Sequence, residues 1–222
     1  LSVQSDPARS DAPTAGRTPA PEPAGLRIFH DLRALAGRST AELLRAPVFA
    51  YALERFLPDT VRSDTLYPGA TVRDSVVLAL SFPAHDLLLT GNRRFLVAQG
   101  CRSGECSASK GLVVADSETG NLCAILYHGD PDPADDRRGS ARAVDRPVTR
   151  IRAEVYLPAP SAATGPLIEA CATQFASATQ RLVPSGYWVD GGAILTRTAP
   201  DFRSHPEVAA RFQPWDGTAQ RY

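Results

Sequence analysis

Between residues 76 and 127, short apolar segments alternate with turn residues, and this pattern constrains the fold more than any other feature of the chain. Glycine-containing turns separate the segments, which is typical of strands that pair antiparallel in chain order. We therefore predict an antiparallel meander, with residues 116–121 as its clearest hairpin turn. The predicted strands are Val76–Phe82, Asp86–Leu89, Arg94–Ala98, Leu112–Ala115 and Leu122–Tyr127.

Helical signals precede this meander. Ser39 and Glu42 fit a capping box, in which each side chain satisfies a backbone amide at the start of a helix. Apolar residues then recur at helical spacing from residue 43 to residue 56. Pro47 is expected to break and restart the helix, which should end before Pro58.

The last third of the chain predicts a strand, a helix and two further strands. The strand covers residues 151–157, the amphipathic helix covers residues 166–182, and the final strands cover residues 187–189 and 193–196. Together with the preceding elements, this order predicts an α+β fold: an antiparallel β-sheet backed by helices, with an additional β-α-β-β C-terminal region.

Composition divides the chain into three parts. Residues 1–25 are rich in Pro and Ala and hold few large apolar side chains, so we expect a disordered linker that could serve as an N-terminal tether. Residues 26–150 are predicted to form an α+β domain. Residues 151–222 are predicted to be an extension packed on the same domain.

Charge and hydropathy exclude two classes of function. The 24 basic and 24 acidic residues give a formal net charge of zero, which argues against a nucleic-acid-binding protein. Apolar runs are too short for a transmembrane segment. The chain starts at Leu1 and contains no methionine, which favours a processed, exported protein.

Enzyme motifs are missing from the sequence. It contains no nucleophile elbow, phosphate-binding or dinucleotide-binding glycine pattern, or zinc-protease helix motif. The acidic stretch at residues 130–136 is interrupted by prolines and predicts a solvated loop rather than a calcium site. We therefore expect a binding protein rather than an enzyme, with no catalytic residue, cofactor or metal. The histidines lack metal-ligand spacing and are expected at the surface or in turns: His30, His85, His128 and His205.

The four cysteines carry the most specific signal. Cys101 and Cys106 can close a small ring between two predicted strands, and this ring either staples the strand connection or presents a recognition loop. Cys123 and Cys171 either bridge to each other or remain buried thiols. A nucleophilic Cys101 acting with a histidine is disfavoured, because a partner five positions away removes the free thiolate.

The stretch around the ring resembles a known family. Residues 92–106, followed by residues 112–116 and 119–122, are similar to the central part of the periplasmic inhibitors of vertebrate (C-type) lysozyme. Those proteins place a strand, a Cys-x-x-x-x-Cys loop, a strand, a tight turn and another strand in this order. The helix upstream is similar in placement too, and the resemblance covers about residues 33–128.

The resemblance implies a periplasmic protein whose disulfide-closed loop plugs the cleft of lysozyme or another peptidoglycan hydrolase. The implied partner-binding residues are Arg102, Ser103, Gly104 and Glu105. In the family, the loop usually reads Cys-Lys-Pro-His-Asp-Cys, and its histidine inserts between the carboxylates of lysozyme. Gly104 occupies the position of that histidine, so we expect weaker inhibition of vertebrate lysozyme.

Two further hypotheses stay open beside an inhibitor of a peptidoglycan-degrading enzyme. One is an envelope binding or scaffolding protein that keeps the inhibitor fold without inhibition and uses its C-terminal region, with Trp188 or Trp215 at the contact. The other, an enzyme, is the least favoured.

Overall fold

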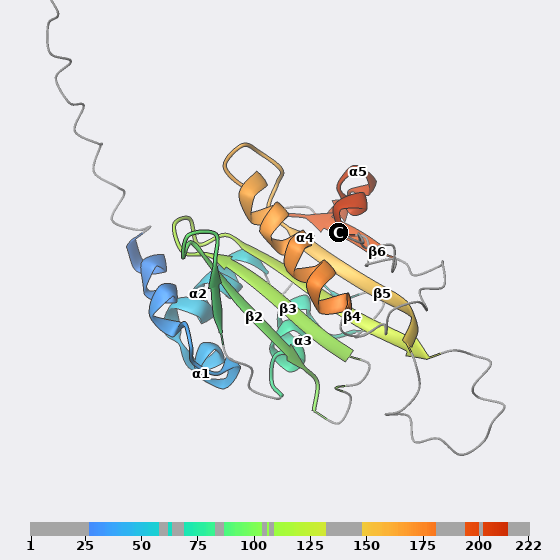
Figure 1. Ribbon diagram of the computed structural model, residues 1–222, viewed down its shortest axis with the longest axis horizontal. Coiled ribbons are helices and arrows are strands. Elements are labelled where there is room, and N and C mark those ends of the chain that lie inside the picture. The colour runs from blue at the N-terminus through green and yellow to red at the C-terminus, as the bar shows by residue number, and fades with distance from the viewer. Residues whose placement is uncertain are drawn as a thin grey trace, which may run out of the picture.

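A sheet of seven strands runs through the described part of the chain, and its strands lie side by side in chain order (Figure 1). The computed structural model describes residues 27–57, 62–63, 69–82, 87–103, 106, 109–131, 148–180, 194–199 and 202–212. The strands are β1 Leu88–Thr90, β2 Phe95–Cys101, β3 Ser109–Asp116, β4 Leu122–Pro131, β5 Val148–Leu157, β6 Ile194–Thr198 and β7 Arg203–Ser204.

Strand pairing confirms the predicted meander from β1 onward and adds a parallel pair. Strands β1 to β5 pair antiparallel with their neighbours, whereas β5 and β6 are parallel and β6 and β7 are antiparallel. Helix α4, Gly165–Gln180, lies between β5 and β6 in the chain and supplies the crossover that a parallel pair needs. The sheet is therefore mixed, and the fold is α+β as predicted.

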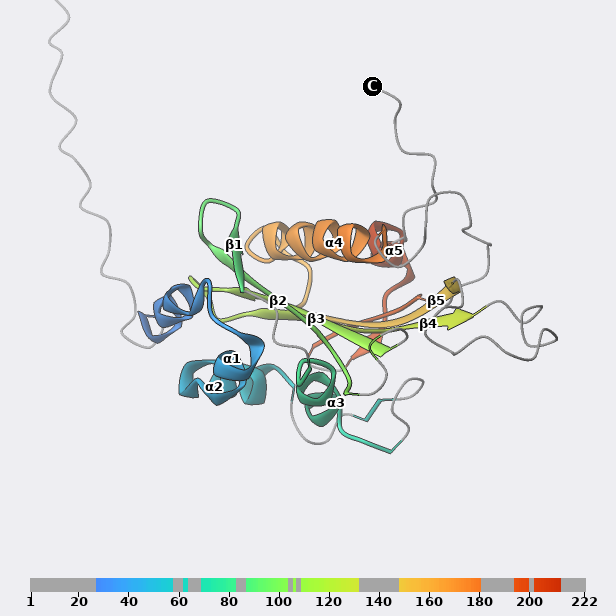
Figure 2. The same ribbon diagram turned by 60° about the horizontal axis from the view of Figure 1, so that its bottom comes forward.

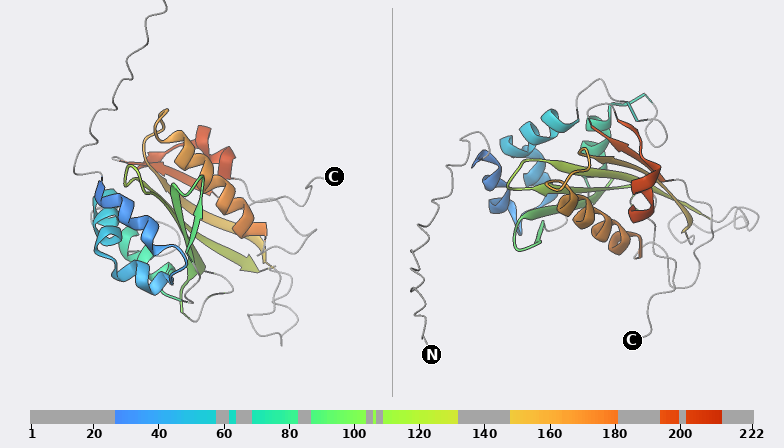
Figure 3. Two further views of the ribbon diagram at one scale, coloured as in Figure 1. Left: turned by 60° about the vertical axis from the view of Figure 1, so that its left-hand side comes forward. Right: turned by 90° about the horizontal axis from the view of Figure 1, so that it is seen from above.

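Helices cover both faces of this sheet (Figure 2). One face carries η1 Arg27–Leu35, α1 Thr40–Arg45, α2 Pro47–Phe56 and α3 Val72–Ala79, and the other carries α4, α5 Pro206–Ala209 and η4 Ala210–Phe212. Figure 3 shows the two layers from further sides. Each face has its own core of buried apolar side chains. The elements after β4 extend the same sheet.

The start signals of the early helices are confirmed. The Glu42 amide donates to Ser39 Oγ at 3.3 Å, and the Ser39 amide donates to Glu42 Oε2 at 3.0 Å, which is the predicted capping box. Pro47 occupies the first turn of α2, which ends at Phe56. The predicted C-terminal helix is α4.

The predicted strand Val76–Phe82 is wrong, because most of this segment forms α3. Thr71 caps the helix by accepting a hydrogen bond from the Asp74 amide at 3.0 Å. Buried and exposed residues then alternate with a helical period: Val72, Val76 and Ala79 are buried, and the intervening apolar residues face solvent. An apolar run of this length fits either a strand or a helix, and here the cap and packing favour the helix.

Two glycines let the end of α3 lie directly on the sheet. A Cβ added at Gly100 in β2 would lie 2.7 Å from Leu80 Cα, and one added at Gly111 in β3 would lie 2.7 Å from Ala79 Cβ. Any larger residue at these positions would push the helix away. The close contact places the residues after α3 beside the end of β2.

Several predictions lie outside the described residues. They concern the linker at residues 1–25, the strand at 187–189, most of the acidic loop, His85, and both tryptophans. In the described part of the chain, no helix is long and apolar enough to cross a membrane.

Candidate functional site

A disulfide closes the connection between β2 and β3. Cys101, the last residue of β2, is bonded to Cys106, with their Cα atoms 4.9 Å apart. The predicted pairing is therefore confirmed. Cys101 is buried, so the base of the disulfide-closed loop is anchored in the sheet.

Phe82 and Ser109 hold the base of the loop from two sides. The Phe82 amide donates to the Cys101 carbonyl at 3.0 Å, and the Cys101 amide donates to the Phe82 carbonyl at 2.6 Å. The Arg102 amide donates to the Ser109 carbonyl at 3.2 Å. Because the backbone is fixed before and after the disulfide, the direction in which the loop leaves the sheet is set by the fold.

The structure locates half of the predicted partner-binding residues. Arg102 and Ser103 are exposed, and Gly104 and Glu105 lie outside the described residues. Phe82 adds an apolar group beside the loop that the sequence analysis did not assign to the site, and it remains 52% exposed. The surface around the loop therefore combines a charged, a hydroxyl-bearing and an aromatic side chain.

Lys110 lies directly opposite Cys101 in the pairing of β2 and β3. Its side chain is half-buried, and burial lowers the pKa of its ammonium group. Lys110 is the only lysine in the chain. The neck of the loop therefore carries a cationic group on each strand, Arg102 after β2 and Lys110 in β3.

The second disulfide joins Cys123 in β4 to Cys171 in α4, with a Cα–Cα distance of 6.3 Å. This finding selects the bridge over the buried thiols, and the described residues hold no free cysteine. The bond fixes α4 on its face of the sheet. Disulfides of this kind persist in oxidising compartments, which favours an exported chain.

A row of polar side chains crosses the sheet beside the loop, and the sequence analysis missed it. Ser109 pairs with His128, and His128 pairs with Arg152, so β3, β4 and β5 each contribute one residue. Asp130 follows two positions after His128 and lies on the same face of β4. The sequence signal for this row is the spacing of His128 and Asp130, which lie two positions apart in one strand. Ser109 and Arg152 come to lie beside them through the register of β3, β4 and β5.

The prediction that the histidines lie at the surface or in turns is only partly confirmed. His128 lies within a strand and its side chain is 27% exposed, so it is neither a turn residue nor a fully exposed one. His205 precedes α5 and contacts Glu207 through Nδ1 at 2.6 Å. His30 lies in η1.

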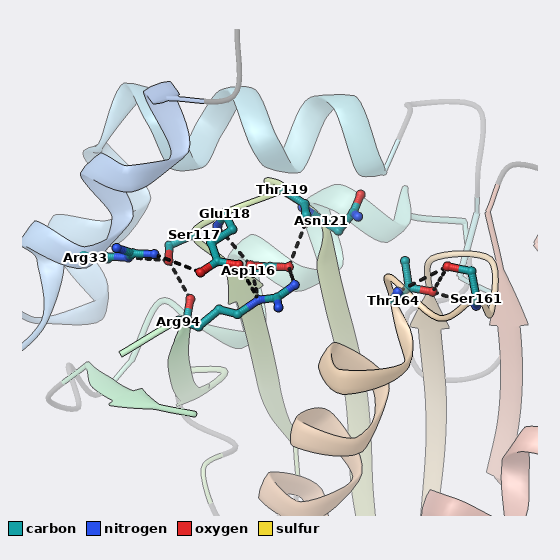
Figure 4. A network of polar contacts seen from close by, with 9 residues as sticks. All are labelled: Arg33, Arg94, Asp116, Ser117, Glu118, Thr119, Asn121, Ser161 and Thr164. Carbon is teal, nitrogen blue, oxygen red and sulfur yellow. Dashed lines mark hydrogen bonds and ion pairs between the residues drawn. The ribbon is translucent and has the colours of Figure 1, made fainter. Parts of the chain in front are cut away.

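The predicted hairpin turn at residues 116–121 holds a polar network of its own (Figure 4). Arg94 donates from Nη2 and Nε to the two carboxylate oxygens of Asp116, at 2.7 and 3.0 Å. The Glu118 amide and the Thr119 hydroxyl also donate to that carboxylate. Burial acts to raise the pKa of Asp116, but these hydrogen bonds outweigh it and the pKa is lowered. The network serves to close the turn.

A buried carboxylate anchors the segment before α3. Glu154 in β5 accepts hydrogen bonds from the Ser63 hydroxyl, at 3.2 and 3.1 Å, and from the Tyr156 hydroxyl. Burial and the neighbouring carboxylate raise the pKa of Tyr156. The phenol therefore remains a hydrogen-bond donor.

Comparison with known proteins gives no relative: no protein-family model, curated protein or solved structure matches the chain.

Proposed function

We propose that the chain is a periplasmic binding protein that blocks a peptidoglycan-degrading enzyme with the loop closed by Cys101 and Cys106. The observation that carries this proposal is the disulfide-closed loop itself, held at its base by Phe82 and Ser109 and exposing Arg102 and Ser103. A loop whose ends are joined by a disulfide loses less conformational entropy when it enters a cleft than an unconstrained segment does.

The charge of Arg102 suits the chemistry of such a target. Glycoside hydrolases that cleave peptidoglycan typically act through a pair of carboxylates, which a guanidinium can engage with two hydrogen bonds. The chain has no net charge, so the attraction has to come from the local surface rather than from a global field. The resemblance of residues 33–128 to lysozyme inhibitors and the two disulfides support a periplasmic location.

Gly104 limits which enzyme the loop can block. Where the inhibitor family carries a histidine, this chain has no side chain to place between two carboxylates. Arg102 and Glu105 keep the basic and acidic positions of the family loop. We therefore expect the preferred target to be a peptidoglycan hydrolase other than vertebrate lysozyme, bound mainly through Arg102.

A binding assay with a panel of muramidases and related wall hydrolases tests the proposal. The full chain should form a complex with one member and inhibit it, and Arg102→Ala and Glu105→Ala should each weaken that complex. Arg45→Ala is the matched control for Arg102→Ala, because Arg45 is an exposed arginine on α1 and its removal changes the net charge equally. Binding that is unchanged in both loop variants would remove the loop from the mechanism.

A scaffolding function is the second candidate, and the size of the C-terminal region favours it. Strands β5, β6 and β7 extend the sheet beyond the stretch that resembles lysozyme inhibitors, and α4 covers one face of it. Such a protein would bind an envelope partner through residues 151–222. Capture of a partner that is not a wall hydrolase, and that Trp188→Ala or Trp215→Ala releases, would support this function over inhibition.

A further inference from the structure

Ser109, His128 and Asp130 are brought together by strand register. Ser109 begins β3 and pairs directly with His128 in β4, and Asp130 lies two residues further along the same strand. Side chains of paired residues, and of residues two apart in one strand, project from the same face of a sheet. The three groups therefore form a line across two neighbouring strands.

The distances within this line define a relay of one hydrogen bond and one ion-pair contact. Ser109 Oγ lies 2.9 Å from His128 Nδ1, and His128 Nε2 lies 3.5 Å from Asp130 Oδ1. The negative charge of Asp130 beside Nε2 favours the neutral tautomer that carries its proton on that nitrogen. Nδ1 is then the acceptor for the Ser109 hydroxyl, which is the arrangement of a nucleophile and its general base.

Arg152 fixes the orientation of Asp130. Its Nε donates to Asp130 Oδ2 at 2.8 Å, and its Nη2 donates to Asp130 Oδ1 at 2.9 Å. A bidentate pair of this kind holds the carboxylate in one plane. Asp130 can therefore orient the His128 ring directly, and Arg152 orients it through Asp130. Asp130 and Arg152 are both positioning residues.

The relay is shielded from solvent to different degrees at its two ends. Ser109 is 6% exposed, and the His128 side chain is 27% exposed. Only a small acyl group can approach a hydroxyl so enclosed, whereas the imidazole is open enough to exchange protons with water. The relay also lies one residue pair from the disulfide-closed loop, because the Ser109 carbonyl accepts from the Arg102 amide.

We propose that Ser109 and His128 form an acyl-transfer site that hydrolyses esters of small acyl groups such as acetyl. Ser109 Oγ attacks the ester carbonyl carbon while its proton moves to His128 Nδ1. The new C–O bond gives a tetrahedral intermediate. That intermediate expels the alcohol, which takes the proton from His128. Water then attacks the acyl-serine with His128 as base, releasing the carboxylic acid and restoring the serine.

Covalent labelling tests the first step without requiring the natural substrate. The full chain, with its disulfides intact, is incubated with a small alkyl fluorophosphonate, in which serine displaces fluoride from phosphorus. Mass spectrometry should find one label per chain, on Ser109, and the label should be lost in Ser109→Ala. Ser81→Ala is the matched control, because the Ser81 hydroxyl is exposed and bonds a carbonyl rather than an imidazole.

Variants of the other groups separate catalysis from structure. His128→Ala should slow labelling about 100-fold or more, the usual contribution of a general base, and added imidazole should restore part of the rate. Asp130→Asn should slow labelling by a smaller factor than His128→Ala, because the ring keeps its base but loses the carboxylate that orients it. Hydrolysis of p-nitrophenyl acetate should follow the same order among the variants.

A structural role for the row gives different results. If the relay only satisfies polar groups at the end of the sheet, Ser109→Ala lowers the thermal midpoint while the wild type takes up no more label than that variant. That result, or labelling of His128→Ala at the wild-type rate, would overturn the proposal. The outcome is independent of the proposed inhibition, since hydrolase binding is measured without the label.

Discussion

Phe82 and Cys101 are 19 positions apart in the chain, yet they exchange two backbone hydrogen bonds, with N–O distances of 3.0 and 2.6 Å. This exchange ties the segment after α3 to the base of the disulfide-closed loop. It depends on how closely α3 approaches β2 and β3, because Phe82 follows the helix by only a few residues. The geometry of the loop is therefore coupled to the packing of a helix on the sheet.

The first prediction concerns the glycines under α3. In Gly100→Ala the new methyl group would lie 2.7 Å from Leu80 Cα, a backbone atom that can move only with the helix. We expect the free energy of unfolding to fall by about 1–3 kcal/mol, as for other overpacked sites. Urea unfolding measures the change. In Gly165→Ala, where nothing lies within 4 Å of the added methyl group, a similar loss would contradict the explanation.

The second prediction compares the two disulfides. Removing a cross-link destabilises a protein more when it closes a longer loop, and the bonds here span 5 and 48 residues. The chain-entropy relation gives about 2 kcal/mol for the Cys101–Cys106 bond and about 4 kcal/mol for the Cys123–Cys171 bond. Paired Cys→Ala variants, unfolded in urea, should follow this order. The reverse order would mean that the Cys101–Cys106 bond contributes more to the free energy of unfolding than its loop length predicts.

The third prediction is a pH dependence at the hairpin turn. The pKa of Asp116 lies below its ordinary value of 3.8 in the folded chain. A lowered pKa means that Asp116 contributes stability above the unfolded-state pKa, and that this contribution is lost as pH falls through the folded-state pKa. Asp116→Asn should therefore cost about 2 kcal/mol or more at neutral pH, because Arg94 loses a buried ionic partner.

Acid titration of stability checks this sign. The difference in unfolding free energy between the wild type and Asp116→Asn should shrink as the pH is lowered from neutral to below the folded-state pKa of Asp116. Asp31→Asn, which removes one carboxylate at an exposed position in η1, is the charge-matched control. A difference that stays constant over the acid range would show that Asp116 stabilises the turn through packing rather than through the charge of its carboxylate.

Local signals predicted the early helices and the meander because the interactions involved are close in sequence. The capping box of Ser39 and Glu42 is a contact between residues three apart, and it forms as expected. The apolar run at residues 76–82 gave the wrong element, since its period is ambiguous and the decision rests on Thr71 and on contact with Gly100 and Gly111. The cap formed by Thr71 and Asp74 is a local contact, but the strand prediction did not use it.

Long-range register explains what the sequence could not predict. The line from Ser109 to His128 and on to Arg152 depends on how β3, β4 and β5 align, and a shift of one residue would place these side chains on the opposite face. The parallel pairing of β5 with β6 likewise depends on the path of α4 over the sheet. The loop could be predicted because two cysteines five apart constrain each other directly.

The last prediction assigns the aromatic ring of Phe82 to the binding surface. Phe82→Ala keeps the backbone hydrogen bonds to Cys101 and removes a ring that is 52% exposed, so the free energy of unfolding should change little. If the loop enters an enzyme cleft, the ring lies at its rim, and affinity for the target hydrolase should fall about 10-fold. Tyr51→Ala on α2 is the matched control, because Tyr51 is also aromatic and 52% exposed. Calorimetric titration that gives equal affinities for the two variants would place Phe82 outside the interface.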